Sequence, residues 1–239
     1  SFFFSIISSQ EINLNVALTV ASSERKTEYL PPERFDLAQL NLSMGPMSAE
    51  EIVKKSYAFS EKVMTSTTFG HQSAVILHMV TRIKPDAKIL WVDTGYNTSA
   101  TYRFADRLIE QLKLNIEIYA PEMTSTRRNV MLGGIPNVED PRHEEFTRQV
   151  KLEPFERATR HLGTEVWITG IRREQTAYRQ GLEIASWSNN GLLKVAPLLN
   201  WNQAQLKAYL QEYNLPDEQD YFDPTKVHDA RECGLQTQL

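Results

Sequence analysis

Short apolar runs alternate with amphipathic stretches through most of residues 60–215. The runs at 89–92, 116–119, 165–169 and 192–197 have the length of buried strands, and 62–64 is a shorter candidate. Apolar residues recur at helical spacing over 71–83, 98–112, 151–162 and 201–213, with Asn200 as the expected cap of the last helix. This alternation predicts an α/β protein whose mostly parallel, twisted sheet carries helices on both faces.

The two ends of the chain lack this alternation. Residues 1–48 are expected to form an irregular N-terminal arm, because prolines and Gly45 interrupt them. Ser48 and Glu51 form a capping-box pattern, which predicts a helix from there to about residue 59. We therefore expect the main domain at 49–215 and a flexible, polar C-terminal tail at 216–239.

The first seven residues, SFFFSII, are apolar but lack the basic residues and the cleavage site of a signal peptide. They suit an edge strand or a packed terminal arm, and a dimer contact is the next alternative. No run approaches 18 consecutive apolar residues, so no membrane-spanning helix is expected. A cytoplasmic protein is the expectation, or a plastid one if the chain is a processed plant-type protein.

The chain has 239 residues, a net charge of −4 and one cysteine. The acidic balance argues against a broad nucleic-acid-binding surface. A single cysteine excludes disulfides within the chain, and it also excludes zinc sites and iron–sulfur clusters built from four of its cysteines. We therefore expect no metal site.

A loop rich in hydroxyl groups follows the first strand candidate and leads into a helix. The unpaired N–H groups and the positive dipole at the start of a helix suit an anion such as phosphate or sulfate. A plain helix cap is the alternative, and the signature of the common NTPase phosphate loop is absent. The candidate ligand-binding residues in this loop are Ser66, Thr67, Thr68, Phe69, Gly70, Gln72 and Ser73.

Polar groups also follow two later strands. After 89–92 come Asp93, Thr94 and Gly95, which suit a ribose or a base edge, or else a plain turn. Arginines follow 165–169, and their rigid donor forks suit a polyanionic ligand, with a solvated turn as the alternative. The candidates there are Gly170, Arg172, Arg173, Gln175 and Arg179.

Lys151 and Arg157 lie six positions apart on one predicted helix. This is not the spacing of neighbours on a helix surface, so the sequence leaves open whether the two cations converge. Because the carboxyl ends of parallel strands meet at one edge of a sheet, we expect the candidates above to form a local pocket for a small anion.

The lone cysteine, Cys233, lies in a polar segment near the end of the sequence. Gly234 allows the backbone to present the thiol, while Arg231 favours the thiolate and Glu232 opposes it. An incidental free thiol is the alternative. Any adduct on Cys233 has to be resolved by a thiol from another molecule, because the chain has no second cysteine.

Taken in order, these segments resemble the motifs of the sulfonucleotide reductase family, most closely its phosphoadenylyl-sulfate (PAPS) reductases. The resemblance covers about 64–213 and the tail, and it implies an adenine-nucleotide α-hydrolase-like fold with a modified PP-loop. The matching segments are 67–73, 93–96 with 101–104, 151–154 with Arg157, 170–175, 194–198 with Trp201, and 231–235.

The resemblance implies that the candidates above bind an adenylyl nucleotide and that Cys233 attacks its sulfur atom. A Cys S-sulfonate would form, and a thioredoxin or glutaredoxin would release sulfite from it. No bound cofactor is implied, since Phe146 and Thr147 stand where cluster-bearing members have a Cys pair. The resemblance therefore favours PAPS as substrate, with adenylyl sulfate (APS) as the alternative, and a homodimer.

Two other functions stay open. One is an ATP-using PP-loop enzyme that adenylates its substrate, although Thr68 and Phe69 stand where such enzymes usually have Ser-Gly. The other is a nucleotide-binding protein without catalysis.

The chain departs from the family pattern at Gln236, where a His is usual, and residues 1–45 match no family motif. A Gly-Tyr and Ser-Ile-Gly-Asp stretch is also missing between Leu215 and Tyr221. Either the chain closes its site differently, or the sequence omits a mobile loop, which is the interpretation we favour.

Overall fold

The computed structural model describes residues 34–226 and Leu235, so the apolar start of the chain and Cys233 lie outside the described residues. The strands form one sheet of order β3-β2-β1-β4-β6-β5. Only β5 runs antiparallel, against β6, so the predicted mostly parallel α/β sheet is confirmed. The strands are β1 (Val63–Thr67), β2 (Lys88–Val92), β3 (Asn115–Tyr119), β4 (Val166–Ile168), β5 (Ala185–Trp187) and β6 (Leu193–Val195).

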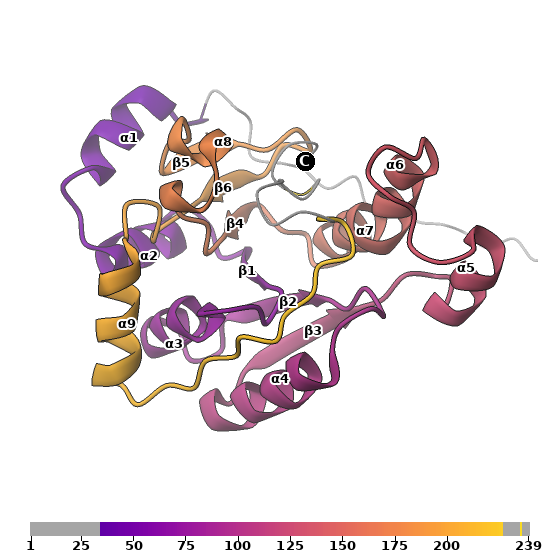
Figure 1. Cartoon of the computed structure of the whole chain (residues 1–239). Helices are drawn as coiled ribbons and strands as arrows, with labels where there is room; N and C mark the ends of the chain where they lie inside the picture. Colours follow the sequence, from indigo (N-terminus) through magenta and orange to yellow (C-terminus); the bar gives the residue numbers. More distant parts are fainter. Residues whose placement is uncertain (1–33, 227–234, 236–239) are drawn as a thin grey trace, which may run out of the picture.

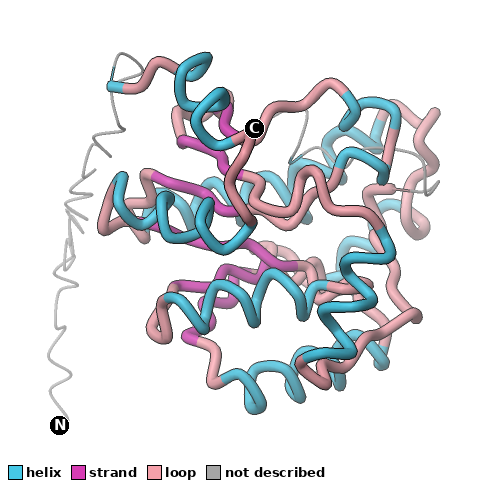
Figure 2. Tube along the Cα trace, turned by 90° about the vertical axis from the view of Figure 1, so that its left-hand side faces the viewer, coloured by secondary structure: helices cyan, strands magenta, loops and turns pink. Residues whose placement is uncertain are grey.

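Helices surround this sheet, and short helical turns join some of them (Figures 1 and 2). They are α1 (Leu37–Met44), α2 (Ala49–Phe59), α3 (Ser73–Ile83), α4 (Ser99–Leu112), α5 (Ser125–Leu132), α6 (Arg142–Thr147), α7 (Glu153–His161), α8 (Ala177–Gln180) and α9 (Gln203–Glu212). A π-helical turn, η2 (Arg148–Leu152), joins α6 to α7, and a 3-10 turn, η3 (Arg173–Gln175), precedes α8.

Alternate strand residues enter two separate apolar layers, as a strand's period of two requires. Ile89 and Trp91 belong to the larger layer, which α1, α2, α3, α4 and α9 cover. Leu90 and Trp167 belong to the smaller layer, beneath Phe155 of α7. The predicted coverage of both sheet faces by helices is therefore confirmed, and Figure 1 shows α7 across the strands from α3 and α4.

Some predicted boundaries are wrong. The first strand was expected at 62–64 but continues to Thr67, because threonine is β-branched and packs well in a sheet even where its hydroxyl suggests a loop. The last helix begins at Gln203 with Asn202 rather than Asn200 as its cap, and Asn202 accepts from the Gln205 N–H. The capping box of Ser48 and Glu51 is confirmed.

Several segments expected to be irregular are helical. The predicted N-terminal arm contains α1, whose Leu40 and Met44 are buried. Asn41 fixes this helix to the sheet edge by accepting from the Ala185 N–H at 2.8 Å and donating to the Ala185 carbonyl at 2.9 Å. The polar stretch 121–150 contains α5 and α6, and the helix expected at 151–162 is the end of a continuous run from Arg142 to His161.

The first part of the expected tail, residues 216–226, has a described path, and we call this segment the strap. Figure 1 shows this segment, in yellow, running from the end of α9 across the carboxyl edge of the strands toward α7. No helix in the described part of the chain has the length and apolar character needed to cross a membrane.

Candidate active site

A cavity of about 300 Å³ opens beside the carboxyl ends of β1, β2 and β4. This volume is at the lower end of the range for small-molecule sites. The structure brings together residues from separate loops there, as expected for a parallel sheet. The predicted site residues in its wall are Ser66, Thr67, Thr68, Gly70, Gln72, Ser73, Thr94, Lys151, Gly170, Arg172, Gln175 and Arg179.

The loop from β1 to α3 is tightly folded. Phe69 and Gln72 adopt left-handed backbone conformations, with φ of 49° and 61°. The Phe69 N–H donates to Thr67 Oγ1 at 3.1 Å, and the Phe69 ring packs edge-on against Trp91 in the core. Phe69 therefore anchors this loop and does not line the cavity.

Two donors at the start of α3 are unpaired. Gln72 Nε2 and Ser73 Oγ are buried in the cavity wall and have no hydrogen-bond partner among the described residues. Unpaired buried polar atoms are costly, so this part of the wall suits a polar ligand. The backbone N–H of Gln72 donates at 2.7 Å to Oδ1 of Asp217, so a strap carboxylate already occupies part of the expected anion site.

The turn after β2 uses Asp93 internally. Asp93 Oδ1 accepts from the Gly95 N–H at 3.0 Å, from the Asn97 amide at 2.8 Å and from the Tyr102 hydroxyl at 2.9 Å. Gly95 has a φ of 77°, which favours glycine. Asp93 and Gly95 thus match the turn alternative, while Thr94 and the unpredicted Asn97 line the cavity.

Buried guanidinium groups line the side of the cavity near β4. Arg172 has 8% of its side chain exposed, donates to Gln72 Oε1 at 3.3 Å and pairs with Glu174. Arg179 is buried and donates to the uncharged oxygen of Gln175. Two buried guanidinium groups therefore lie beside the unpaired donors of α3, and their donor forks suit a polyanion.

Arg173 points away from this group. Its guanidinium donates to the Leu182 carbonyl at 2.7 Å, and it does not line the cavity. The neighbouring Gly170 does line it, and a Cβ on Gly170 would lie 3.1 Å from Ile76 Cγ2. Gly170 thus allows α3 to approach the loop after β4.

Lys151 reaches the cavity from the π-helical turn. Its ammonium group lies 2.5 Å from Oδ2 of Asp223 in the strap, and the two side chains are only 3% and 4% exposed. Burial raises the pKa of Asp223, but Lys151 and the hydrogen bonds from Thr225 outweigh burial and hold that pKa below its ordinary value. Asp223 is therefore a carboxylate at neutral pH.

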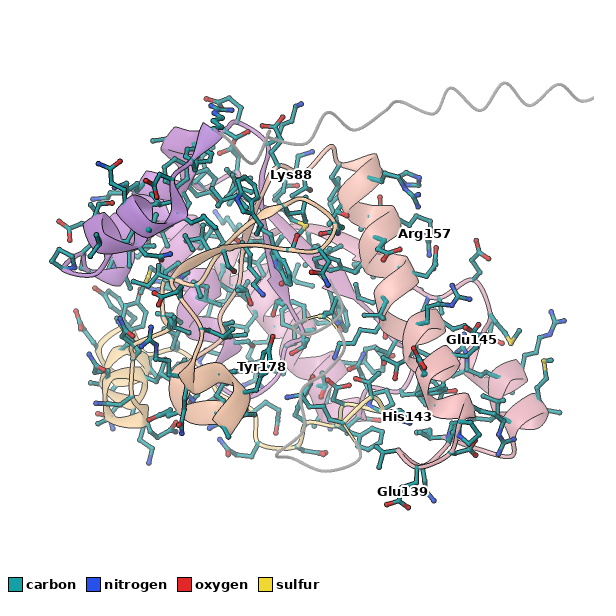
Figure 3. The ribbon with its side chains drawn as sticks, turned by 90° about the horizontal axis from the view of Figure 1, so that it is seen from above. Lys88, Glu139, His143, Glu145, Arg157 and Tyr178 are labelled. Atoms are coloured by element: carbon teal, nitrogen blue, oxygen red, sulfur yellow. The ribbon has the colours of Figure 1, made fainter. Side chains whose placement is uncertain are left out.

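Arg157 does not converge with Lys151. Its guanidinium pairs with Glu153 at 2.7 Å, donates to the Ala120 carbonyl at 2.8 Å and lies over the Tyr119 ring. Figure 3 shows Arg157 on the long helical run that also carries Glu145, across the molecule from Tyr178 of α8. The structure thus answers the open question about this pair: only Lys151 lines the cavity.

The strap supplies wall residues that sequence reasoning missed: Tyr221, Phe222, Asp223, Pro224 and Lys226. No local pattern points to them, since Asp223 and Lys151 are 72 positions apart. Cys233 lies outside the described residues, but Leu235, two positions later in the sequence, is buried in the smaller apolar layer and lines the cavity.

The described residues contain no group of three His, Cys, Asp or Glu side chains placed to hold a metal ion. Phe146 and Thr147, at the position where the resemblance puts a cysteine pair in cluster-bearing relatives, are both buried. The Phe146 ring packs against Tyr96 with ring centroids 5.5 Å apart. An aromatic contact thus fills this position.

The sequence profile of the phosphoadenosine phosphosulfate reductase domain matches residues 62–223. A phosphoadenosine 5′-phosphosulfate reductase from a Synechococcus species is 36% identical over 184 residues, which cover 75% of this chain and 78% of that protein. One from Vibrio parahaemolyticus is 35% identical over 222 residues, covering 89% and 85%.

Solved structures give a consistent picture. The crystal structure of a PAPS reductase from Candida auris, in a phosphate complex, is 25% identical with a TM-score of 0.67 and covers 79% of this chain and 89% of its own. An FMN adenylyltransferase from Candida glabrata is 13% identical with a TM-score of 0.52, covering 80% and 62%, and is similar in fold alone.

Proposed function

This chain belongs to the phosphoadenosine phosphosulfate reductase family, and we propose that it reduces 3′-phosphoadenylyl sulfate to sulfite and adenosine 3′,5′-bisphosphate in sulfate assimilation. The substrate carries several negative charges. The cavity offers buried guanidinium groups with unpaired donors beside them, which suits such a ligand.

The nucleotide is held by the cavity wall. Arg172 and Arg179 pair with its phosphate oxygens, while Gln72 and Ser73 donate to the phosphosulfate end. Charge that develops on the leaving phosphate is stabilised by these fixed donors, which need no rearrangement during the reaction.

Cys233 is the nucleophile. Its thiolate forms a bond to the sulfur of the sulfate group, the bond from that sulfur to the bridging oxygen breaks, and adenosine 3′,5′-bisphosphate leaves with the electron pair. A thiolate of reduced thioredoxin or glutaredoxin then attacks the Cys233 sulfur, which expels sulfite and forms a mixed disulfide. The second thiol of that partner resolves the mixed disulfide, so the partner is oxidised and Cys233 is regenerated.

The observation that carries this proposal is the place of Leu235. Its side chain lies in the cavity wall, packed in one layer with Phe155 and Trp167, and it follows Cys233 by two positions in the sequence. Leu235 therefore lies at the cavity, as expected if the neighbouring Cys233 acts there.

The test is a sulfite assay with PAPS or APS and reduced thioredoxin or glutaredoxin. Wild type should release sulfite faster from PAPS, and the Cys233→Ser variant should release none. Without a reductant, mass spectrometry should find one sulfonate group per chain, absent in Cys233→Ser. A clear preference for APS would overturn the substrate, and full turnover by Cys233→Ser would overturn the mechanism.

Two arms of the same experiment address the remaining expectations. Incubation with ATP and analysis for pyrophosphate tests the adenylating alternative, which the fold likeness to an FMN adenylyltransferase does not by itself support. Light scattering during size-exclusion chromatography tests the expected homodimer.

A further inference from the structure

The strap is attached to the loops around the cavity at successive points along its length. Asp217 accepts from the Gln72 N–H at 2.7 Å, at the start of α3. The carbonyl of Asp220 then accepts from the Thr98 and Thr101 hydroxyls at 2.9 and 3.1 Å, at the start of α4. At the far end of the strap, Asp223 accepts from the Lys151 ammonium group at 2.5 Å, and Thr225 Oγ1 accepts from it at 3.4 Å.

This last attachment differs from the others in burial and charge. Both side chains of the pair are almost fully buried, whereas Asp217 is 22% exposed and pairs with the exposed His71. Oδ1 of Asp223 is held by the Thr225 hydroxyl at 2.7 Å and the Thr225 N–H at 3.0 Å, which leaves Oδ2 for Lys151. Breaking a buried ion pair leaves an uncompensated charge and is strongly unfavourable.

We propose that Asp223 is a positioning residue for the proposed reaction, acting through Lys151. The pair fixes the strap to the π-helical turn at a point ten positions before Cys233 in the sequence. An anchor this close to a nucleophile raises the effective concentration of the nucleophile at the site and reduces the entropy lost when it attacks.

The anchor lies apart from most of the residues proposed to bind the nucleotide. The unpaired donors of α3 and the guanidinium groups near β4 lie on other wall segments, so most of the proposed nucleotide contacts do not involve Asp223. Loss of the anchor should therefore lower kcat much more than it raises KM. A residue that merely supports the fold would not produce this split.

The decisive variant is Asp223→Asn, which keeps the shape of the side chain and removes its charge. Asp220→Asn is the matched control, because it removes an equal charge from the exposed part of the same strap and keeps the carbonyl that binds Thr98 and Thr101. We expect Asp223→Asn to lower kcat for PAPS at least about tenfold, with a smaller rise in KM, and Asp220→Asn to match wild type.

A second measurement does not depend on activity. The rate of trypsin cleavage after Lys226, measured by intact-protein mass spectrometry, reports how often the strap detaches. The rate of cleavage after the exposed Arg127 of α5 is the internal reference. Asp223→Asn should speed cleavage after Lys226 at least about tenfold relative to Arg127, because a released strap is accessible. If Asp223→Asn does not fold, Thr225→Val removes the hydroxyl that orients the carboxylate and should shift both readouts in the same direction, by less.

The inference rests on the proposed function, but the two fail in different ways. If wild type releases no sulfite from PAPS or APS, the proposed function fails, and the trypsin experiment still tests the anchor. If wild type is active and Asp223→Asn matches it in kcat and in cleavage after Lys226, the anchor is overturned. A lower kcat without faster cleavage also overturns it, because the strap would then have stayed attached.

Discussion

The indole N–H of Trp167 donates a 2.7 Å hydrogen bond to the hydroxyl of Ser66. This bond joins β4 to β1 at the cavity, where Ser66 lines the wall and Trp167 is fully buried. A serine hydroxyl has one proton to donate. Because Ser66 accepts from Trp167, its proton stays available for an anionic ligand.

Ser66→Ala should therefore lower stability even without a ligand. It leaves the buried Trp167 N–H unpaired, which costs about 1–3 kcal/mol in the free energy of unfolding. Ser73→Ala is the control, since the Ser73 hydroxyl has no partner among the described residues and its loss should not destabilise the ligand-free protein. Urea unfolding of the two variants measures the difference, and equal losses would contradict this account.

Arg179 and Arg157 should differ in their effect on nucleotide binding. Arg179→Gln removes a buried guanidinium from the cavity wall and should weaken binding of adenosine 3′,5′-bisphosphate at least about tenfold. Arg157→Gln removes a group held by Glu153 and the Ala120 carbonyl, outside the wall, and should leave binding unchanged. Titration calorimetry measures the affinity of each variant. A comparable loss of affinity in both variants would show that Arg157 also contributes to the binding site.

Gly70→Ala should weaken nucleotide binding, because the strap lies against Gly70. A Cβ there would sit 3.2 Å from the Tyr221 ring and 3.3 Å from Thr68 Oγ1, closer than ordinary contact. Gly70→Ala should displace Tyr221 and raise KM for the nucleotide while barely changing Tm. Gly45→Ala is the control, because the nearest atom to a Cβ at Gly45 is 3.5 Å away, and it should leave both KM and Tm unchanged. An unchanged KM in Gly70→Ala would contradict this prediction, because the strap would then have moved aside without affecting nucleotide binding.

His78 should make stability depend on pH. Burial, and then the charge of Arg82, lower the pKa of His78, which contacts the Tyr209 hydroxyl at 3.1 Å. Between its lowered folded pKa and its unfolded value of about 6.5, the unfolded chain binds more protons, so stability falls as the pH falls through this window. From pH 7.5 to 5.5 the Tm of wild type should drop more than that of His78→Gln, and parallel curves would contradict the assignment.

The sheet was predictable because parallel strands buried on both faces read as continuous apolar runs, as at Ile89–Val92. The end of β1 was not, since Thr65 is fully buried although its hydroxyl is typical of a loop. The helices α1, α5 and α6 are short, and tertiary contacts such as Asn41 with Ala185 hold the first of them in place. Such contacts leave no periodic pattern in the sequence.

Part of the cavity was predictable because its residues follow strands closely. Thr68, Thr94 and Gly170 do so, and parallel topology brings them together. Asp223 could not be found in this way, because its role depends on Lys151, far away in the sequence. The same limit left Arg157 beside Lys151 as an equal candidate until the helix geometry separated them.

The π-helical turn at Arg148–Leu152 makes the cavity sensitive to chain length as well as to residue identity. A π turn carries more residues than an α turn, and each residue of an α-helix adds about 100° of rotation. Deleting one residue there would let the run close into a regular α-helix. The turn between α6 and Lys151 would then change, so Lys151 could no longer face the cavity while the buried face of α6 stayed buried. An insertion or deletion in this stretch would thus act like a substitution of the cavity's lysine, even with every side chain retained.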